Sequence, residues 1–243
     1  MSGALRSDSS TPGHGGGVIR GVLFDYSGTL FRLQPGESWI DGLDGPPLDE
    51  GQREELITLL TATRQDMLHL PPDLLEAWHR RDLDPETHRA VYLAVLADCG
   101  IPLAPGAAEQ LYSRMLDPES WFAYPDTVAV LRDLRAAGIP VGVVSNIAWD
   151  IRDVFRRHRA YDFVEEFVLS YVEGVMKPDP KIFTVACQRI GVPPEQVLMI
   201  GDSPHADGAA AAIGCATAIV EPLPTAKRPD GLRAALAAHG LDD

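Results

Sequence analysis

Lysine is scarce in this chain: among 243 residues it occurs only at Lys177, Lys181 and Lys227. Lysine and arginine together number 21 against 35 aspartates and glutamates, which gives a formal net charge of -14 at pH 7. Nucleic acids and anionic membranes bind cationic surfaces, because both are themselves negatively charged. The charge balance therefore predicts neither a nucleic-acid partner nor a membrane partner.

Cysteine is also rare, and Cys99, Cys187 and Cys215 form no C-x-x-C pair. This spacing indicates neither a disulfide framework nor a zinc site, and it is typical of core thiols in a reducing compartment. The first 17 residues lack the apolar segment of a signal peptide, and no apolar run reaches the length of a membrane span. We expect a cytoplasmic protein in which the Gly/Ser-rich residues 1–17 are a disordered leader.

Hydrophobic residues make up 45% of the chain and charged residues 23%, enough for a core with a smaller second domain. From residue 49 to 121 the pattern is helical, with apolar residues on one side of a first helix from Leu56 to Met67. Prolines mark the starts of further helices at residues 72, 85 and 105. The segment predicts an all-helical insert after the first strand.

Beyond Pro125 short apolar strands alternate with helices, the first of which has Asp126 as its expected N-cap. The strands are expected at residues 140–144, 167–169, 197–200 and 216–220. Alternation of this kind predicts a parallel sheet covered by helices on both faces. The fold class is therefore α/β: a Rossmann-like, doubly wound parallel sheet with an inserted all-helical domain. Residues 18–33 and 122–243 would form the core, and residues 34–121 the insert, with hinges near residues 31–36 and 118–125.

Polar side chains lie just after the predicted strands or at the start of a helix. They are Asp25 after Val22-Leu23-Phe24, Ser145 and Asn146, Lys177, and Asp202 with nearby Asp207. Taken singly, each has an ordinary alternative: a turn or helix cap for the aspartates and for Ser145-Asn146, and a solvent-facing lysine. Because the carboxyl ends of parallel strands share one edge of a sheet, all of these groups can meet there. Their order and placement together predict a functional site.

These motifs resemble those of the haloacid dehalogenase-like hydrolases, most closely the phosphatases with a helical cap inserted after the first strand. The resemblance covers residues 18–220 and implies that Asp25 is the nucleophile that forms an aspartyl-phosphate. It implies that Ser145 and the Asn146 backbone donate hydrogen bonds to phosphate oxygens. Lys177 would bridge the nucleophile and the phosphate, a position that cancels the repulsion between a carboxylate and a phosphate dianion.

The resemblance also implies a magnesium site. Asp25 and Asp202 would be carboxylate ligands, the Ser27 backbone carbonyl a third ligand, and Asp207 a nearby ligand or an outer acceptor. Magnesium prefers six oxygen ligands and keeps several waters, so few protein groups suffice. In the turn after Asp25, Gly28 and Thr29 are expected to bind substrate, because a sharp turn lets backbone N–H groups approach a ligand.

One position departs from the family pattern. Most phosphatases of this family carry a second aspartate two residues after the nucleophile, as general acid and base; here that residue is Ser27. A serine hydroxyl does not exchange protons usefully near neutral pH, and a positioned acid or base contributes about 10²–10⁴-fold. We expect a preference for leaving groups that need no proton, unless His205 or a cap side chain supplies one.

Three other branches of the family fit the sequence less well. The phosphonate-cleaving branch needs a cap lysine, which residues 34–121 lack, and the cation-pumping branch needs membrane spans. The metal-independent 2-haloacid dehalogenases resemble this chain from Asp25 to Arg32, but they lack the acidic pair that Asp202 and Asp207 supply.

The sequence thus predicts a magnesium-dependent hydrolase of a small phosphorylated metabolite, as a monomer or homodimer. The alternatives are a catalytically weak or inactive binder of phosphate ligands and a 2-haloacid dehalogenase. Residues 79–81, His-Arg-Arg, are predicted to lie on a solvated helix face of the cap.

Overall fold

The computed structural model describes residues 18–34, 39–43, 45–61 and 71–241. The leader expected at residues 1–17 lies outside these described residues. Among the residues described, no helix combines the length and the apolar character needed to cross a membrane.

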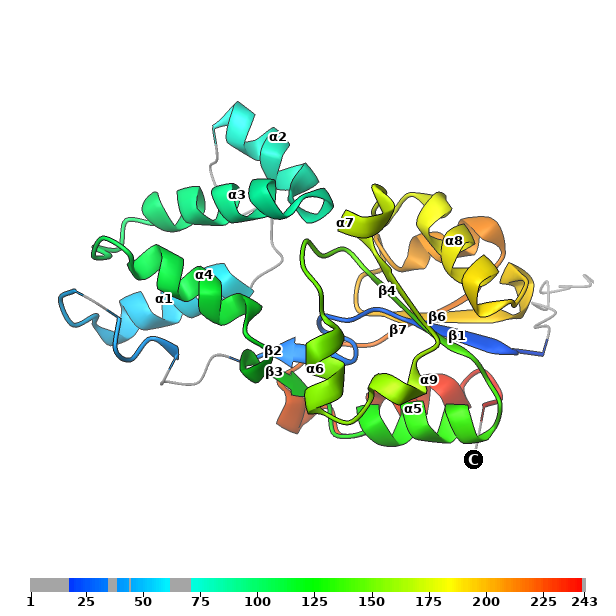
Figure 1. Ribbon diagram of the computed structural model, residues 1–243. Helices are drawn as coiled ribbons and strands as arrows, with labels where there is room; N and C mark the ends of the chain where they lie inside the picture. Colours follow the sequence, from blue (N-terminus) through cyan, green and yellow to red (C-terminus); the bar gives the residue numbers. More distant parts are fainter. Residues whose placement is uncertain (1–17, 35–38, 44, 62–70, 242–243) are drawn as a thin grey trace, which may run out of the picture.

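One parallel sheet of five strands forms the core, and Figure 1 shows it between two layers of helices. In spatial order its strands are β5 (Glu166–Leu169), β4 (Val141–Ser145), β1 (Gly21–Phe24), β6 (Val197–Gly201) and β7 (Ala216–Ile219). Every neighbouring pair is parallel, and Phe24 at the end of β1 is paired with Val143 on one side and Ile200 on the other. The α/β parallel-sheet prediction is confirmed.

Helices cover both faces of this sheet, which explains why β1 is apolar at consecutive positions. Val22 and Phe24 face one hydrophobic cluster, whereas Leu23 between them belongs to a second cluster. The first face is covered by α5 (Thr127–Ala136), α6 (Arg152–Arg157) and α9 (Gly231–Ala237). The second is covered by α8 (Pro180–Ile190) and the 3-10 helix η7 (Gly208–Ile213), above the sheet in Figure 1. A short helix, α7 (Ser170–Glu173), follows β5 directly.

The inserted segment forms the cap at the left of Figure 1. It contains α1 (Glu50–Thr61), α2 (Pro72–Arg80), the 3-10 turn η3 (Arg81–Leu83), α3 (Pro85–Ala97) and α4 (Ala107–Leu116). Pro72 and Pro85 begin their helices as expected, and the Asp84 side chain caps α3 by accepting from Thr87 N at 2.7 Å. No strand lies in the described parts of residues 49–115. The first expected helix ran to Met67, and residues 62–70 lie outside the described chain.

The two chain crossings between cap and core differ from the irregular hinges that we expected. They form a two-stranded antiparallel ribbon of β2 (Phe31–Leu33) and β3 (Trp121–Ala123), with Leu33 opposite Trp121. A 3-10 turn, η4 (Pro118–Ser120), leads into β3. Each strand has three residues, too short for its alternating pattern to stand out in the sequence. The crossings are therefore hydrogen-bonded to each other where they were expected to be irregular.

Asp126 also differs from its expected role. Its backbone has helical dihedral angles (φ -90°, ψ -10°), and its side chain makes no capping bond to α5. Instead, one carboxylate oxygen accepts from Leu232 N at 2.8 Å and from Arg233 N at 3.2 Å. Asp126 thus caps α9 across the core. Asp230, at the formal start of that helix, makes no such bond.

His88 joins the cap to the core. It is buried on α3, stacked on Tyr92 at 4.5 Å between ring centroids, and its edge meets the core residue Trp149 at 5.1 Å. Its Nδ1 atom lies 2.9 Å from the Tyr112 hydroxyl. Burial, with a smaller contribution from Arg81, lowers the pKa of His88 from 6.5 to about 3, so the ring is neutral at physiological pH.

Replacing Asp126 with alanine should lower the free energy of unfolding by about 1–3 kcal/mol, because one buried and one partly buried backbone N–H group of α9 lose a charged acceptor. Asp230→Ala is the matched control and should cost less than about 1 kcal/mol, because only the helix-dipole contribution is lost. Urea unfolding measures both. Equal losses would show that Asp126 does not cap α9.

His88→Gln should change how stability depends on pH. The pKa of His88 is lower in the folded protein than in the unfolded chain. The full free energy of unfolding is therefore present above pH 6.5, and it decreases as the pH falls towards 3. In this range His88 lowers the free energy of unfolding of the native protein by up to about 1.4 kcal/mol per pH unit, and the glutamine variant should not show this decrease. Urea unfolding at about pH 7 and about pH 5 tests this difference. The exposed His79→Gln is the control and should follow the native curve; a parallel His88→Gln curve would contradict the assignment.

Candidate active site

Asp25 lies where β1 ends, at the centre of the sheet edge. Its backbone N–H donates to Ile200 O of the neighbouring strand at 2.9 Å, so the strand pairing fixes the residue up to its own backbone. The side chain is buried, and Thr29 Oγ1 donates to its Oδ2 atom at 3.3 Å. A carboxylate at this position is held in one orientation and is shielded from bulk water.

Lys177 connects two of the carboxylates that follow the strands. Its Nζ atom donates to Asp25 Oδ1 and to Asp207 Oδ1, each at 2.6 Å, and the side chain is almost fully buried. Burial opposes the charge, but the two carboxylates outweigh it and raise the pKa of Lys177 above its ordinary value. The lysine is therefore an ammonium ion, and its charge offsets that of the acidic groups.

Asn146 holds the backbone of Lys177 in place. Its side-chain Oδ1 accepts from Lys177 N at 2.7 Å, and its Nδ2 donates to Lys177 O at 2.8 Å. Both hydrogen-bonding sides of the amide are thus used to orient the lysine. The side chain has this role, whereas the sequence assigned the residue only a backbone contribution.

Asp202 and Asp207 belong to the loop after β6. Asp207 Oδ2 accepts from Ser203 N at 2.9 Å, so both of its oxygens already have hydrogen-bond partners. Two glycines permit the close approach of these carboxylates. A β-carbon on Gly201 would lie 2.1 Å from Asp207 Cγ, and one on Gly28 would lie 2.4 Å from Asp202 Oδ2. Gly28 also has φ +80°, a conformation that other residues rarely adopt.

The acidic cluster of Asp25, Asp202 and Asp207 carries more negative charge than Lys177 balances. One oxygen from each carboxylate lies within 4.8 Å of the others, so three negative charges face one positive charge. Burial raises the pKa of Asp25 to about 7, even though Lys177 opposes the shift. Burial and then Asp207 raise the pKa of Asp202 to about 6. A divalent cation would restore neutrality, and an all-oxygen donor set fits magnesium.

Ser145 is the last residue of β4, the strand beside β1, and Asn146 follows it. A cavity of about 120 Å³ lies between this edge and the cap. Its lining combines core residues with cap residues: Ser27, Leu33, Leu60, Arg81, Asp82, His88, Tyr92, Met115, Trp121, Asn146, Ile147 and Trp149. Ser27 and Asn146 thus connect this cavity to the loops that carry Asp25 and Lys177, whereas Asp25 itself is not among the lining residues. His205, named from the sequence as a substitute proton donor, is exposed and does not line this cavity.

The prediction that residues 79–81 lie on a solvated helix face is only partly correct. His79 and Arg80 are exposed, as predicted for a solvated helix face. Arg81 lies mostly buried, with its guanidinium 4.2 Å from the centre of the Trp78 ring, and it lines the cavity. The helix tightens to a 3-10 turn at Arg81, so the periodicity of α2 does not predict which way this side chain points.

Arg228 is a residue of the site that the sequence did not suggest. Its guanidinium lies 3.2 Å from the centre of the Tyr124 ring and donates to Gly28 O at 2.7 Å and to Thr29 O. It therefore holds the turn that follows the nucleophile. No local pattern could reveal this contact, because the partners are separated by 199 residues in the sequence.

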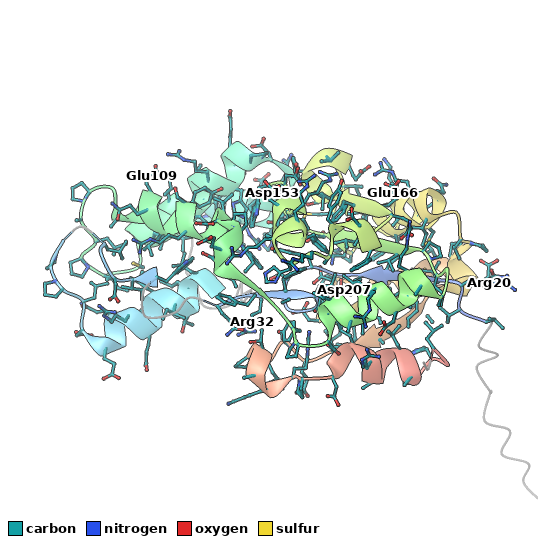
Figure 2. All side chains as sticks on the ribbon, turned by 60° about the horizontal axis from the view of Figure 1, so that its bottom comes forward. Arg20, Arg32, Glu109, Asp153, Glu166 and Asp207 are labelled. Atoms are coloured by element: carbon teal, nitrogen blue, oxygen red, sulfur yellow. The ribbon has the colours of Figure 1, made fainter. Side chains whose placement is uncertain are left out.

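Arg32, the residue that suggested a haloacid dehalogenase, lies where cap and core meet and is labelled in Figure 2. Its guanidinium donates to Pro222 O, and Arg32 is not among the residues that line the cavity. In this arrangement the arginine supports the C-terminal segment.

Comparisons with known proteins identify the family. The family model of haloacid dehalogenase-like hydrolases matches residues 19–214. The phosphoglycolate phosphatase of Escherichia coli strain K12 is 30% identical over 211 residues, 81% of this chain and 79% of the relative. The glyceraldehyde 3-phosphate phosphatase of Methanopyrus kandleri is 40% identical over 80 residues, 32% of this chain and 34% of the relative. The chain spans at most half the length of several further curated relatives.

A solved structure shares the fold. The L-2-haloacid dehalogenase of Xanthobacter autotrophicus superposes with a TM-score of 0.62 at 22% identity, covering 89% of this chain and 83% of that protein. At this identity the likeness shows the architecture and not the chemistry. The family model, which covers most of the chain, decides the classification. The chain belongs to the haloacid dehalogenase-like hydrolases.

Proposed function

We propose that this protein is a magnesium-dependent phosphatase of a small phosphorylated metabolite, and that it acts through an aspartyl-phosphate on Asp25. One observation carries the proposal: a buried ammonium, Lys177, lies between Asp25 and Asp207 and beside Asp202. A buried carboxylate that attacks a phosphate dianion needs such cationic compensation, because the two negative groups repel each other.

Each residue of the site has a role in this reaction. Asp25 attacks phosphorus, and Lys177 balances charge on the nucleophile and on the phosphate. The Ser145 hydroxyl and the Asn146 backbone N–H would orient phosphate oxygens, the positioning on which phosphoryl transfer chiefly depends. Asp25, Asp202 and the Ser27 carbonyl would hold magnesium, which supplies positive charge at the phosphate. Asp207, with both oxygens engaged, orients Lys177 and the loop after β6.

The size of the cavity and the names of relatives support a small substrate. The cavity between core and cap measures about 120 Å³, which is little space for a substrate. The relatives named as phosphatases act on phosphoglycolate and on glyceraldehyde 3-phosphate. We therefore propose a substrate of this size class.

The two competing functions, a 2-haloacid dehalogenase and a binding module without catalysis, place different demands on the site. A metal-independent dehalogenase has no use for the excess negative charge of the acidic cluster, and Arg32 is committed to Pro222. A binding module without catalysis would keep the phosphate and metal contacts but would release no product.

Asp25→Asn should abolish release of phosphate from aryl and acyl phosphates, whose leaving groups need no proton, because the amide is a poor nucleophile. The native protein with magnesium should turn over both substrates. The matched control is Asp162→Asn, which removes an exposed carboxylate elsewhere in the core and should keep native rates. Binding of phosphate with no release above the Asp25→Asn background would indicate the binding module. Release of halide from a 2-haloacid in EDTA would indicate the dehalogenase.

Asp202→Ala should abolish magnesium binding, since the ion loses one of its carboxylate ligands. Titration calorimetry measures the affinity directly, and thermal unfolding with and without magnesium gives a readout independent of activity. The native protein and Asp162→Asn should be stabilised by magnesium, whereas Asp202→Ala should not. Equal stabilisation of all three would place the ion elsewhere.

A further inference from the structure

Ser27 leaves the site without the family's proton donor, and the structure brings another carboxyl group to the same cavity. Asp82, in the cap turn η3, lines the cavity together with Ser27 and Asn146. We propose that Asp82 is the general acid and base of this enzyme, in place of the missing aspartate. The inference rests on the proposed phosphatase function and assigns a catalytic residue that the first motif does not contain.

The position of Asp82 is fixed by the core. Ser170 Oγ, just after β5, donates to Asp82 O at 2.6 Å and accepts from Ile147 N at 2.8 Å. Ile147 follows Asn146, the residue that holds Lys177. A single serine thus connects the backbone of η3 to the loop that carries the phosphate-binding groups. The backbone of η3 is therefore anchored to the loop that carries Asn146, and Asp82 lines the cavity beside this loop.

The surroundings of Asp82 suit a group that exchanges protons. The side chain is about nine-tenths buried. Its Oδ2 lies 3.6 Å from Arg81 NH2 and its Oδ1 lies 3.8 Å from His88 Nε2, both too long for a hydrogen bond. His88 is neutral, so it offers no ion pair. The carboxyl group is thus not locked in a short, strong salt bridge that would hold it permanently ionised.

Charged and titratable neighbours act on Asp82 from several elements. Arg81 belongs to the same turn, His88 and Tyr92 to α3, and Lys177 to the core. Burial raises the pKa of Asp82, and this effect outweighs the opposing charges of Arg81 and Lys177. A raised pKa favours the protonated form, which is the form that an acid needs before the reaction.

The proposed steps balance in atoms and charge. An Asp25 oxygen bonds to phosphorus as the bond from phosphorus to the ester oxygen breaks. The electron pair remains on the ester oxygen, which takes the proton of Asp82 and leaves as an alcohol. The Asp82 carboxylate then takes a proton from water while the water oxygen bonds to phosphorus. The bond between Asp25 and phosphorus breaks, inorganic phosphate leaves, and both carboxyl groups return to their starting forms.

The test compares two substrates with leaving groups of different basicity. With the full chain and magnesium, kcat/KM is measured for an alkyl phosphate and for an aryl phosphate, in the native protein and in Asp82→Asn. Loss of an acid should lower the alkyl rate by about 100-fold or more, and the aryl rate at least tenfold less, since only the alkoxide needs a proton. The matched control is Glu86→Gln, which removes an exposed cap carboxylate on α3 and should leave both rates native.

A rescue experiment separates acid catalysis from a structural role. Adding Ser27→Asp to Asp82→Asn places a carboxyl group at the family's usual position and should restore the alkyl rate at least tenfold. An equal loss on both substrates, or no rescue, would overturn the role of Asp82 while leaving the proposed phosphatase intact. Absence of magnesium-dependent turnover of either substrate by the native protein would overturn the proposed function, and this inference with it.

Discussion

The Lys177 ammonium between Asp25 and Asp207 is the interaction on which the rest of the site depends. Two carboxylates within 4.8 Å repel each other by roughly 3 kcal/mol at an effective dielectric constant of about 20, and here there are three. Without the lysine, the buried edge of the sheet would favour protonated aspartates, which are poor nucleophiles and poor metal ligands. The lysine therefore keeps the cluster partly ionised, and the remaining negative charge creates the demand for a cation.

Placing that ammonium requires exact backbone positions in three distant segments. Asn146 fixes the lysine backbone through both sides of its amide, while Gly201 and Gly28 leave room for two carboxylates that any side chain would displace. Arg228 holds the Gly28 carbonyl from the far end of the chain. Strand pairing supplies the common reference for these segments, because β1, β4 and β6 are neighbours whose carboxyl ends share one edge.

This dependence on the sheet explains which features the sequence could predict. A buried parallel strand has a continuous apolar pattern, so the sheet and the polar residues that follow β1, β4 and β6 could be read from the sequence. The β2–β3 ribbon could not, because its strands are only three residues long. The roles of Arg228, Asp126 and Asp82 also escaped prediction. Each depends on contacts between segments that are distant along the chain, and such contacts leave no local pattern.

Because Ser27 stands where the family usually has its second aspartate, the proposed acid belongs to the cap and not to the core. An acid two residues after Asp25 would be present in the core whatever the position of the cap. If Asp82 is the acid, it is present at the site only when η3 contacts the core, and the hydrogen bond from Ser170 to the Asp82 backbone carbonyl is one such contact. Protonation of the leaving group would then depend on the position of the cap. A cap that excludes water would also strengthen the attraction between Lys177 and a bound phosphate, so the same cap position would supply both the proton and the low-dielectric surroundings that the proposed reaction needs.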